Sequence, residues 1–151
     1  MRQFASSNPG SRRRLALRLI GAVALGFAAL PSAAAAVGPD LLLARSSDHS
    51  QFGVSVESEV RPVPMRRIHS WKIHITDASG APLSQAVVRV SGGMPEHHHG
   101  LPTQPRVVET ATAGDYIMSG VRFSMTGRWV LNLDIRARDG RSDTVTFSFV
   151  L

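Results

Sequence analysis

The chain has 151 residues, a length that suits one domain rather than two. Its 17 basic and 11 acidic residues give a formal net charge of +6, but five arginines lie within the first 18 positions, where no acidic residue occurs, so the rest of the chain carries only +1. That balance removes most of the electrostatic basis for binding nucleic acid or an anionic membrane. The absence of cysteine excludes disulfides and thiolate metal ligands.

The N-terminal segment has the composition of an export signal. Three arginines at positions 12–14 precede an apolar run from 15 to 30, and the alanines at 33–36 offer several A-x-A cleavage positions. This order predicts a cleaved signal peptide over residues 1–36 and a mature periplasmic protein with no stable membrane span. Two alternatives stay open: an uncleaved segment that anchors the protein in the membrane, and a twin-arginine rather than an ordinary export route.

Residues 37–51 are polar after a short leucine run, and we interpret them as a flexible N-terminal arm. From residue 52 onward, apolar and polar residues alternate, first in "FGVSVESEV" and then in "IHSWKIHIT", which is the pattern of half-buried strands. Further β-branched runs follow, separated by turn pairs such as Ala113-Gly114 and Asp139-Gly140. About seven short strands without helical periodicity predict an all-β, immunoglobulin-like antiparallel β-sandwich over residues 52–151.

The aromatic residues are assigned mainly to the core. Trp71 and Trp129 have apolar neighbours two positions away in their strands, so both are expected to pack inside, and Met118 is interpreted as a packing residue too. Tyr116 is either a tyrosine that ties a strand corner to the backbone through its hydroxyl or an ordinary half-buried aromatic residue. No serine lies in a Gly-x-Ser-x-Gly elbow, which argues against an enzyme.

The stretch "SGGMPEHHHGLPT", residues 91–103, concentrates potential metal ligands. Pro95 favours an extended conformation at Met94, and if the chain stays extended, His97 and His99 point to one side and His98 to the other. Imidazole nitrogen combined with methionine sulfur suits copper, Cu(I) more than Cu(II), whereas zinc more often uses cysteine or carboxylate. A histidine-rich tract alone is a weak signal, because polar surface loops also collect histidines.

A further ligand is expected from another loop at the same end of the sandwich. Met125 lies at a predicted turn beside Gly127, where it has no core to fill, and is the preferred candidate. The alternative is that Met125 covers the edge of the core near Phe123. Glu96 is either an oxygen ligand, or a partner that orients an imidazole, or simply a solvated loop carboxylate.

The other histidines are dispersed along the chain. His69, near the start of a strand, could reach the site and is a less certain ligand, as is His98. His74 alternates with the apolar positions of its strand and is expected to face solvent, and His49 lies in the arm, so neither is expected at the site.

Two longer segments, "GAPLSQAVVRVSGGMPEHHHGLPTQPRV" and "GDYIMSGVRFSMTGRWVLNLDI", resemble the YtkA-like domain family, which is related to FixH-type proteins. The resemblance covers about residues 66–151. It implies a small exported or membrane-anchored β-sandwich, associated in some members with copper handling or with assembly of haem-copper oxidases, and it implies copper ligands at Met94, His97, His99 and Met125. The chain departs from the family's pattern at His98, where a small residue is common, and in lacking the retained membrane helix of FixH proteins.

Three functions are consistent with these observations. The first is an exported protein that binds one copper ion for delivery to a partner, for buffering or for tolerance. The second is an envelope interaction or oxidase-assembly module whose histidine loop is a docking surface and requires no metal. The third, a copper enzyme, lacks a second catalytic group in the sequence.

Overall fold

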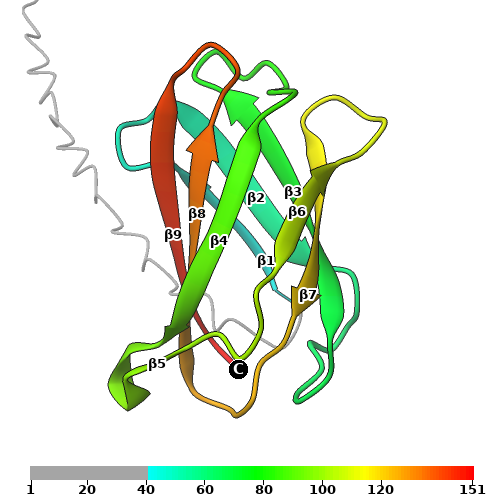
Figure 1. Ribbon diagram of the computed structural model, residues 1–151, viewed down its shortest axis with the longest axis vertical. Helices are drawn as coiled ribbons and strands as arrows, with labels where there is room; N and C mark the ends of the chain where they lie inside the picture. Colours follow the sequence, from blue (N-terminus) through cyan, green and yellow to red (C-terminus); the bar gives the residue numbers. More distant parts are fainter. Residues whose placement is uncertain (1–40) are drawn as a thin grey trace, which may run out of the picture. The chain divides into compact units, whose positions relative to one another are not determined.

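The computed structural model describes residues 41–151, so the predicted signal peptide and the first four residues of the predicted arm lie outside the described part of the chain. The described part forms two antiparallel sheets that face each other (Figure 1). One sheet has the strand order β1-β2-β3-β7-β6, and the other has the order β5-β4-β8-β9. The strands are β1 Leu42–Ser46, β2 Phe52–Ser58, β3 His69–Asp77, β4 Val87–Met94, β5 His99–Gly100, β6 Arg106–Glu109, β7 Asp115–Val121, β8 Arg128–Arg136 and β9 Ser142–Val150.

The alternation in the sequence becomes the two faces of each strand, because successive side chains on a strand point to opposite sides. In β3, Trp71, Ile73 and Ile75 are buried between the sheets, and β8 contributes Trp129 and alternate residues after it from the opposite side. The predicted all-β antiparallel sandwich is confirmed, as is the burial of both tryptophans and of Met118. The narrower immunoglobulin-like classification stays a prediction.

The prediction of a flexible arm over residues 37–51 is wrong from residue 41 onward. Leu41 is only 1% exposed, and β1 pairs with β2 from Leu42 opposite Glu57 to Ser46 opposite Gly53. As an edge strand, β1 bonds to a neighbour on one side only, and almost all of its side chains are exposed. Its sequence therefore lacks the alternation that identified the other strands.

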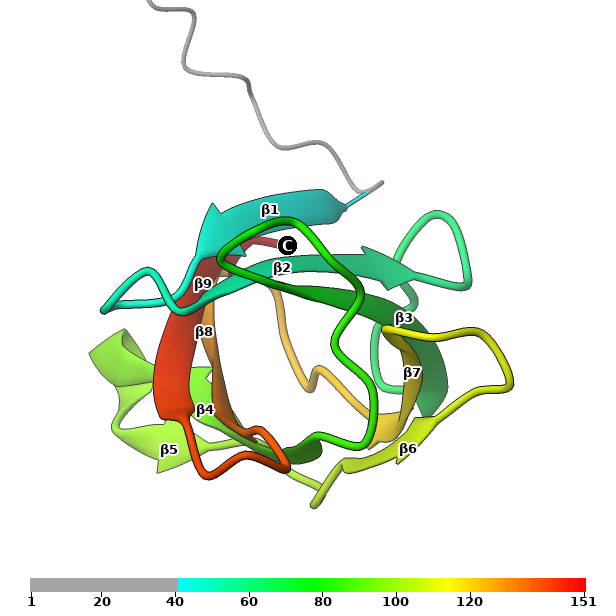
Figure 2. The same ribbon diagram turned by 90° about the horizontal axis from the view of Figure 1, so that it is seen from above.

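The two sheets come together on the side where β1 lies near β9 (Figure 2). There the guanidinium of Arg45 donates to the carbonyl oxygen of Thr146 at 2.8 Å. The carboxylate of Asp143, at the start of β9, accepts hydrogen bonds from the Ser47 hydroxyl at 2.5 Å and from the His49 backbone N–H at 2.9 Å. These bonds fix the turn between β1 and β2 against the second sheet.

Tyr116 connects the two halves of the sandwich through its hydroxyl. The side chain is 1% exposed, and the hydroxyl donates to the carbonyl oxygen of Leu83 at 2.7 Å and accepts from the backbone N–H of Ala86 at 3.0 Å. Of the two alternatives for Tyr116, the structure shows the hydroxyl-to-backbone tie. Its target is the connection between β3 and β4, which crosses from one sheet to the other.

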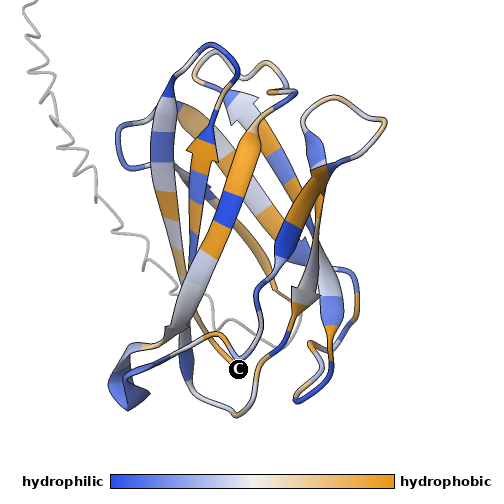
Figure 3. Ribbon diagram, in the orientation of Figure 1, coloured by the Kyte–Doolittle hydropathy of each residue, from blue (hydrophilic) through white to orange (hydrophobic). Residues whose placement is uncertain are grey.

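The ends of the sandwich differ in what they carry. The lower end in Figure 1 holds the β2–β3 and β7–β8 connections and the β4–β5 segment, while the upper end holds the β1–β2, β3–β4, β6–β7 and β8–β9 connections. Figure 3 shows that the tip of the β4–β5 segment is hydrophilic, in contrast to the apolar strand interiors. Among residues 41–151, no helix is long and apolar enough to cross a membrane.

Candidate metal centre

The histidine loop is a compact turn rather than an extended stretch. Met94 is extended, as predicted, but residues Pro95–His97 then form one turn of 3₁₀ helix, and His98 adopts the left-handed conformation with φ 53°. The chain returns as β5, which pairs with the end of β4 so that His99 lies opposite Met94. The predicted extended path is wrong because proline, with its fixed φ, also favours the first position of a helical turn.

The turn nevertheless brings the two predicted imidazoles together. The ring centroids of His97 and His99 are 6.0 Å apart, and the ring planes are inclined by 32°. The Nδ1 atom of His99 lies 3.1 Å from the carbonyl oxygen of Gly100, which can only accept, so Nδ1 donates and Nε2 keeps its lone pair. Metal-binding histidines commonly have this second bond to a carbonyl, which fixes the tautomer.

Met94 is buried rather than part of an exposed loop. As the last residue of β4 it turns inward and is 1% exposed. A Cβ placed on Gly127 would lie 2.6 Å from the Met94 Cε methyl carbon, so the side chain packs directly against the β7–β8 turn. The sequence could not show this burial, because a methionine can be either the last buried residue of a strand or the first residue of the following loop.

Met125 lies in the β7–β8 turn and is 41% exposed, as expected of a residue without a core position. Its carbonyl oxygen accepts a hydrogen bond from the indole Nε1 of Trp129 at 3.0 Å. The same indole contacts the ring of His99 edge-on, with centroids 5.9 Å apart. Trp129, assigned to the core from the sequence, therefore also links the turn that carries Met125 to the histidine loop.

Glu96 points toward β8 from the 3₁₀ turn. One of its carboxylate oxygens lies 3.4 Å from Nε of Arg128, and both side chains are more than half exposed. Such surface pairs contribute at most about 1 kcal/mol. This geometry agrees with the interpretation of Glu96 as a solvated carboxylate.

His69 is buried away from the loop imidazoles. Its ring lies 5.6 Å from that of Phe123 and 6.3 Å from that of Trp71, and its Nδ1 donates to the carbonyl oxygen of Arg67 at 3.1 Å. Desolvation lowers the pKa of His69, and the hydrogen bond to Arg67 opposes that effect only partly. The structure thus places this less certain ligand inside the aromatic core rather than beside His97 and His99.

The remaining histidines pair with aspartates elsewhere in the fold. His74 is exposed, as predicted, and its Nδ1 lies 2.5 Å from a carboxylate oxygen of Asp115. His49 bonds through Nδ1 to Asp143 at 2.9 Å, and this hydrogen bond raises the pKa of His49. Desolvation raises the pKa of Asp143, but its hydrogen bonds from Ser47 and His49 outweigh that effect and leave the pKa well below its ordinary value.

A shallow groove beside the candidate ligands runs along the end of β4. It has a volume of about 430 Å³ and includes Met94, His98 and His99 in its lining. Within residues 41–151, no three histidine, aspartate or glutamate side chains form a cluster that could hold a metal ion. The candidate centre is thus a pair of imidazoles accompanied by methionine sulfur.

Fold and site together define a small antiparallel β-sandwich with a histidine pair and two methionines at one end. The chain belongs to the YtkA-like family, whose family model matches residues 47–134 and so includes every candidate ligand. Its relation to FixH-type proteins stays a prediction.

One solved structure with a similar fold is a DUF4426 family protein from Pseudomonas aeruginosa PAO1. The two chains share 15% sequence identity with a TM-score of 0.54, and the alignment covers 73% of this chain and 94% of that one. At this identity the similarity shows the fold alone. No curated protein matches the sequence.

Proposed function

We propose that this protein is an exported copper-binding protein that holds one copper ion at the Met–His centre, which comprises Met94, His97, His99 and Met125. Its role is binding rather than catalysis, in copper delivery, buffering or tolerance. The observation that carries the proposal is the exposed pair His97 and His99, with rings 6.0 Å apart and with Nε2 of His99 free to bind an ion.

The methionines favour copper over harder metals. Met94 is the cross-strand neighbour of His99, and Met125 lies on the turn whose carbonyl is bonded to the indole packed against His99. Thioether sulfur is a soft ligand that suits Cu(I), whereas zinc sites rely mainly on cysteine, histidine and carboxylate. Methionine has three rotatable side-chain bonds, so Met94 can turn its sulfur toward an ion held by the imidazoles.

The direct test is a titration of the purified protein with Cu(I) in the presence of the competing chelator bathocuproine disulfonate. We expect the wild type to take up one equivalent and the double variant His97→Ala/His99→Ala to lose it. His98→Asn is the matched control, because asparagine tolerates the left-handed conformation at position 98. Equal, weak binding by all three proteins would leave the loop as a docking surface without a required metal.

Export is tested separately from copper binding. We expect the protein recovered from a periplasmic fraction to begin near residue 37, as the A-x-A positions at 33–36 predict. N-terminal sequencing that finds the intact first segment in a membrane fraction would favour the anchored alternative.

A further inference from the structure

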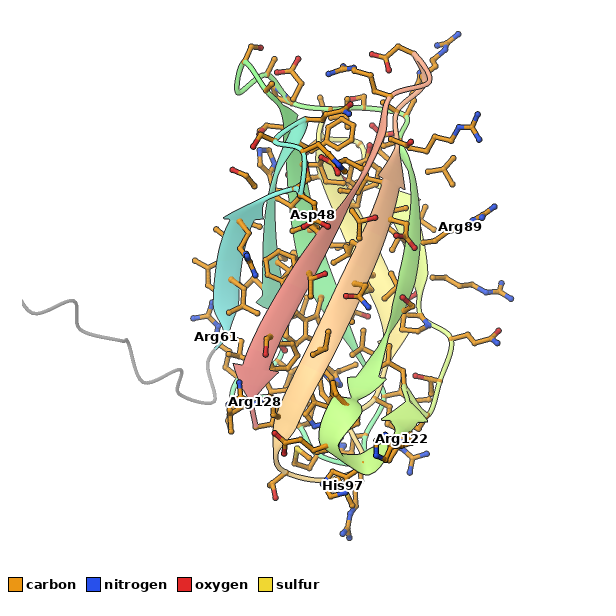
Figure 4. The ribbon with its side chains drawn as sticks, turned by 90° about the vertical axis from the view of Figure 1, so that its left-hand side faces the viewer. Asp48, Arg61, Arg89, His97, Arg122 and Arg128 are labelled. Carbon is orange, nitrogen blue, oxygen red and sulfur yellow. The ribbon has the colours of Figure 1, made fainter. Side chains whose placement is uncertain are left out.

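Arginines surround the end of the sandwich that carries the Met–His centre. Three lie in the β2–β3 connection, one begins β6, and two flank the β7–β8 turn. We call this set the arginine rim; its members are Arg61, Arg66, Arg67, Arg106, Arg122 and Arg128. Figure 4 shows Arg61, Arg122 and Arg128 toward the same end of the molecule as His97.

The arginine rim is only partly neutralised. The acidic side chains at this end are Glu57, Glu59 and Glu96, so the side chains carry a net charge of +3. The carboxylate of Leu151, whose backbone bonds to Gly127, lowers this to +2. Glu57 pairs with Arg61, and Glu96 pairs loosely with Arg128. Within the described residues, the other four arginines of the rim form no ion pair.

The acidic residues gather at the opposite end. Of the ten acidic residues in 41–151, six lie in or beside the connections of the upper end, namely Asp48, Asp77, Glu109, Asp115, Asp139 and Asp143. Figure 4 shows Asp48 in the upper half, far along the strands from His97. The arginines at this upper end, such as Arg138 and Arg141, offset these carboxylates only in part. The described residues are therefore electrically polarised, with their positive end at the candidate metal centre.

This polarity has a consequence for how a metal reaches the centre. A positive rim repels a hydrated copper cation and attracts an anion, and fields of this kind change association rates by about 10-fold to 1,000-fold. The effect extends about 10 Å at 0.1 M salt, which is enough to act on a donor approaching the surface. A centre that collected free cations would be served better by an excess of carboxylates, and most of the acidic residues of 41–151 lie at the far end.

We propose that copper reaches the Met–His centre as part of a net-anionic Cu(I) complex and not as the free cation. The inference rests on the proposed function, because it concerns how copper is delivered to that site. The transfer is a ligand exchange: bonds from copper to the donor break as bonds to imidazole nitrogen and thioether sulfur form. The copper stays Cu(I), and the donor leaves with its negative charge. The arginine rim holds the anionic donor during the exchange.

The test measures the rate of Cu(I) transfer by stopped-flow from two synthetic peptides that share one methionine-containing core, flanked in one by glutamates and in the other by lysines. The rate of transfer from the glutamate-flanked peptide is expected to exceed that from the lysine-flanked peptide by about tenfold at low salt, and the difference is expected to disappear at high salt. A third donor, the anionic Cu(I) complex of bathocuproine disulfonate, distinguishes a small chelate from a protein-like surface. If the arginine rim accelerates transfer from this chelate as well as from the glutamate-flanked peptide, negative charge alone is recognised; if it accelerates transfer from the peptide only, the donor is a protein-like surface.

Two charge-reversal variants make the test specific. Arg67→Glu/Arg106→Glu changes two exposed members of the arginine rim, and Arg89→Glu/Arg136→Glu is the matched control on exposed positions of β4 and β8. We expect the first variant to lose the preference for the anionic donor and the control to keep it. Both should retain equilibrium copper binding, because neither changes a candidate ligand.

The outcomes separate this inference from the proposed function. If the wild type binds no copper at equilibrium, the proposed function fails and the inference fails with it. If copper binds but the two peptides transfer it equally fast, or the rim variant keeps the wild-type preference, only the inference is overturned.

Discussion

Met94 lies both in the core and beside the candidate centre, so its role in packing can be tested separately from the role of its sulfur as a ligand. The side chain is 1% exposed and its methyl group packs against Gly127. Met94→Ala removes most of the side chain and leaves a cavity, whereas Met94→Leu keeps nearly the same volume and removes only the thioether. The two variants should therefore differ strongly in stability and agree in copper binding.

The magnitudes follow from the burial of Met94. Truncation of a buried methionine to alanine costs about 2–5 kcal/mol, while a methionine-to-leucine exchange usually costs less than about 1.5 kcal/mol. For a domain of this size, each kcal/mol lowers Tm by several degrees, so Met94→Ala should lower Tm by about 10 °C or more. If Met94 is a ligand, both variants weaken Cu(I) binding by more than about tenfold, or about 1.4 kcal/mol.

Urea unfolding of the metal-free proteins gives the stability change, and chelator competition gives the Cu(I) affinity of each variant. Met125→Leu is the companion variant, since its side chain is 41% exposed and the exchange should leave stability nearly unchanged while copper binding weakens. A Met94→Leu protein that binds Cu(I) as tightly as the wild type would refute the assignment of Met94 as a ligand and leave it as a packing residue.

Three further predictions concern other parts of the fold. Gly127→Ala should lower stability and disturb the centre, because φ at this position is +130° and the new Cβ would lie 2.6 Å from the Met94 Cε; unchanged urea unfolding would contradict this. The pKa of Asp143 is lower in the folded than in the unfolded state. The ionised carboxylate therefore contributes its full stabilisation of the fold above the unfolded pKa of about 3.9, and this stabilisation is lost as the pH falls from there toward the folded pKa. Between pH 6 and pH 2, the free energy of unfolding should thus fall less steeply in Asp143→Asn than in the wild type. Parallel curves for the two proteins would contradict this role of Asp143. Tyr116→Phe leaves the partly buried Leu83 carbonyl and Ala86 N–H without their partner and should lower the free energy of unfolding by about 1 kcal/mol, whereas an unchanged Tm would show the tie to be dispensable.

Much of the fold could be predicted from the sequence because it depends on local alternation. The residues around Trp71 and Trp129 repeat with period two, and burial between two sheets follows from that period. The edge strand β1 could not be predicted in this way, since almost all of its side chains are exposed. Asp143 was missed for a different reason, because Ser47 and His49, which donate to its carboxylate, lie more than 90 positions earlier.

The candidate centre was predicted in part. The residue types of the histidine loop indicated that His97 and His99 lie close together, although a 3₁₀ turn and a left-handed residue bring them together instead of an extended path. The burial of Met94 depends on where β4 ends, which the sequence does not specify to a single residue. The arginine rim is assembled from three separate connections, so it emerges only when the topology is known.

The ligand set of the copper-loaded protein is the most direct test of the central claim. X-ray absorption at the copper K-edge of the Cu(I) form distinguishes nitrogen from sulfur neighbours. We predict both kinds, from His97 and His99 and from Met94 and Met125, with the sulfur contribution reduced in Met125→Leu. A spectrum with nitrogen and oxygen neighbours only would contradict a joint histidine–methionine site.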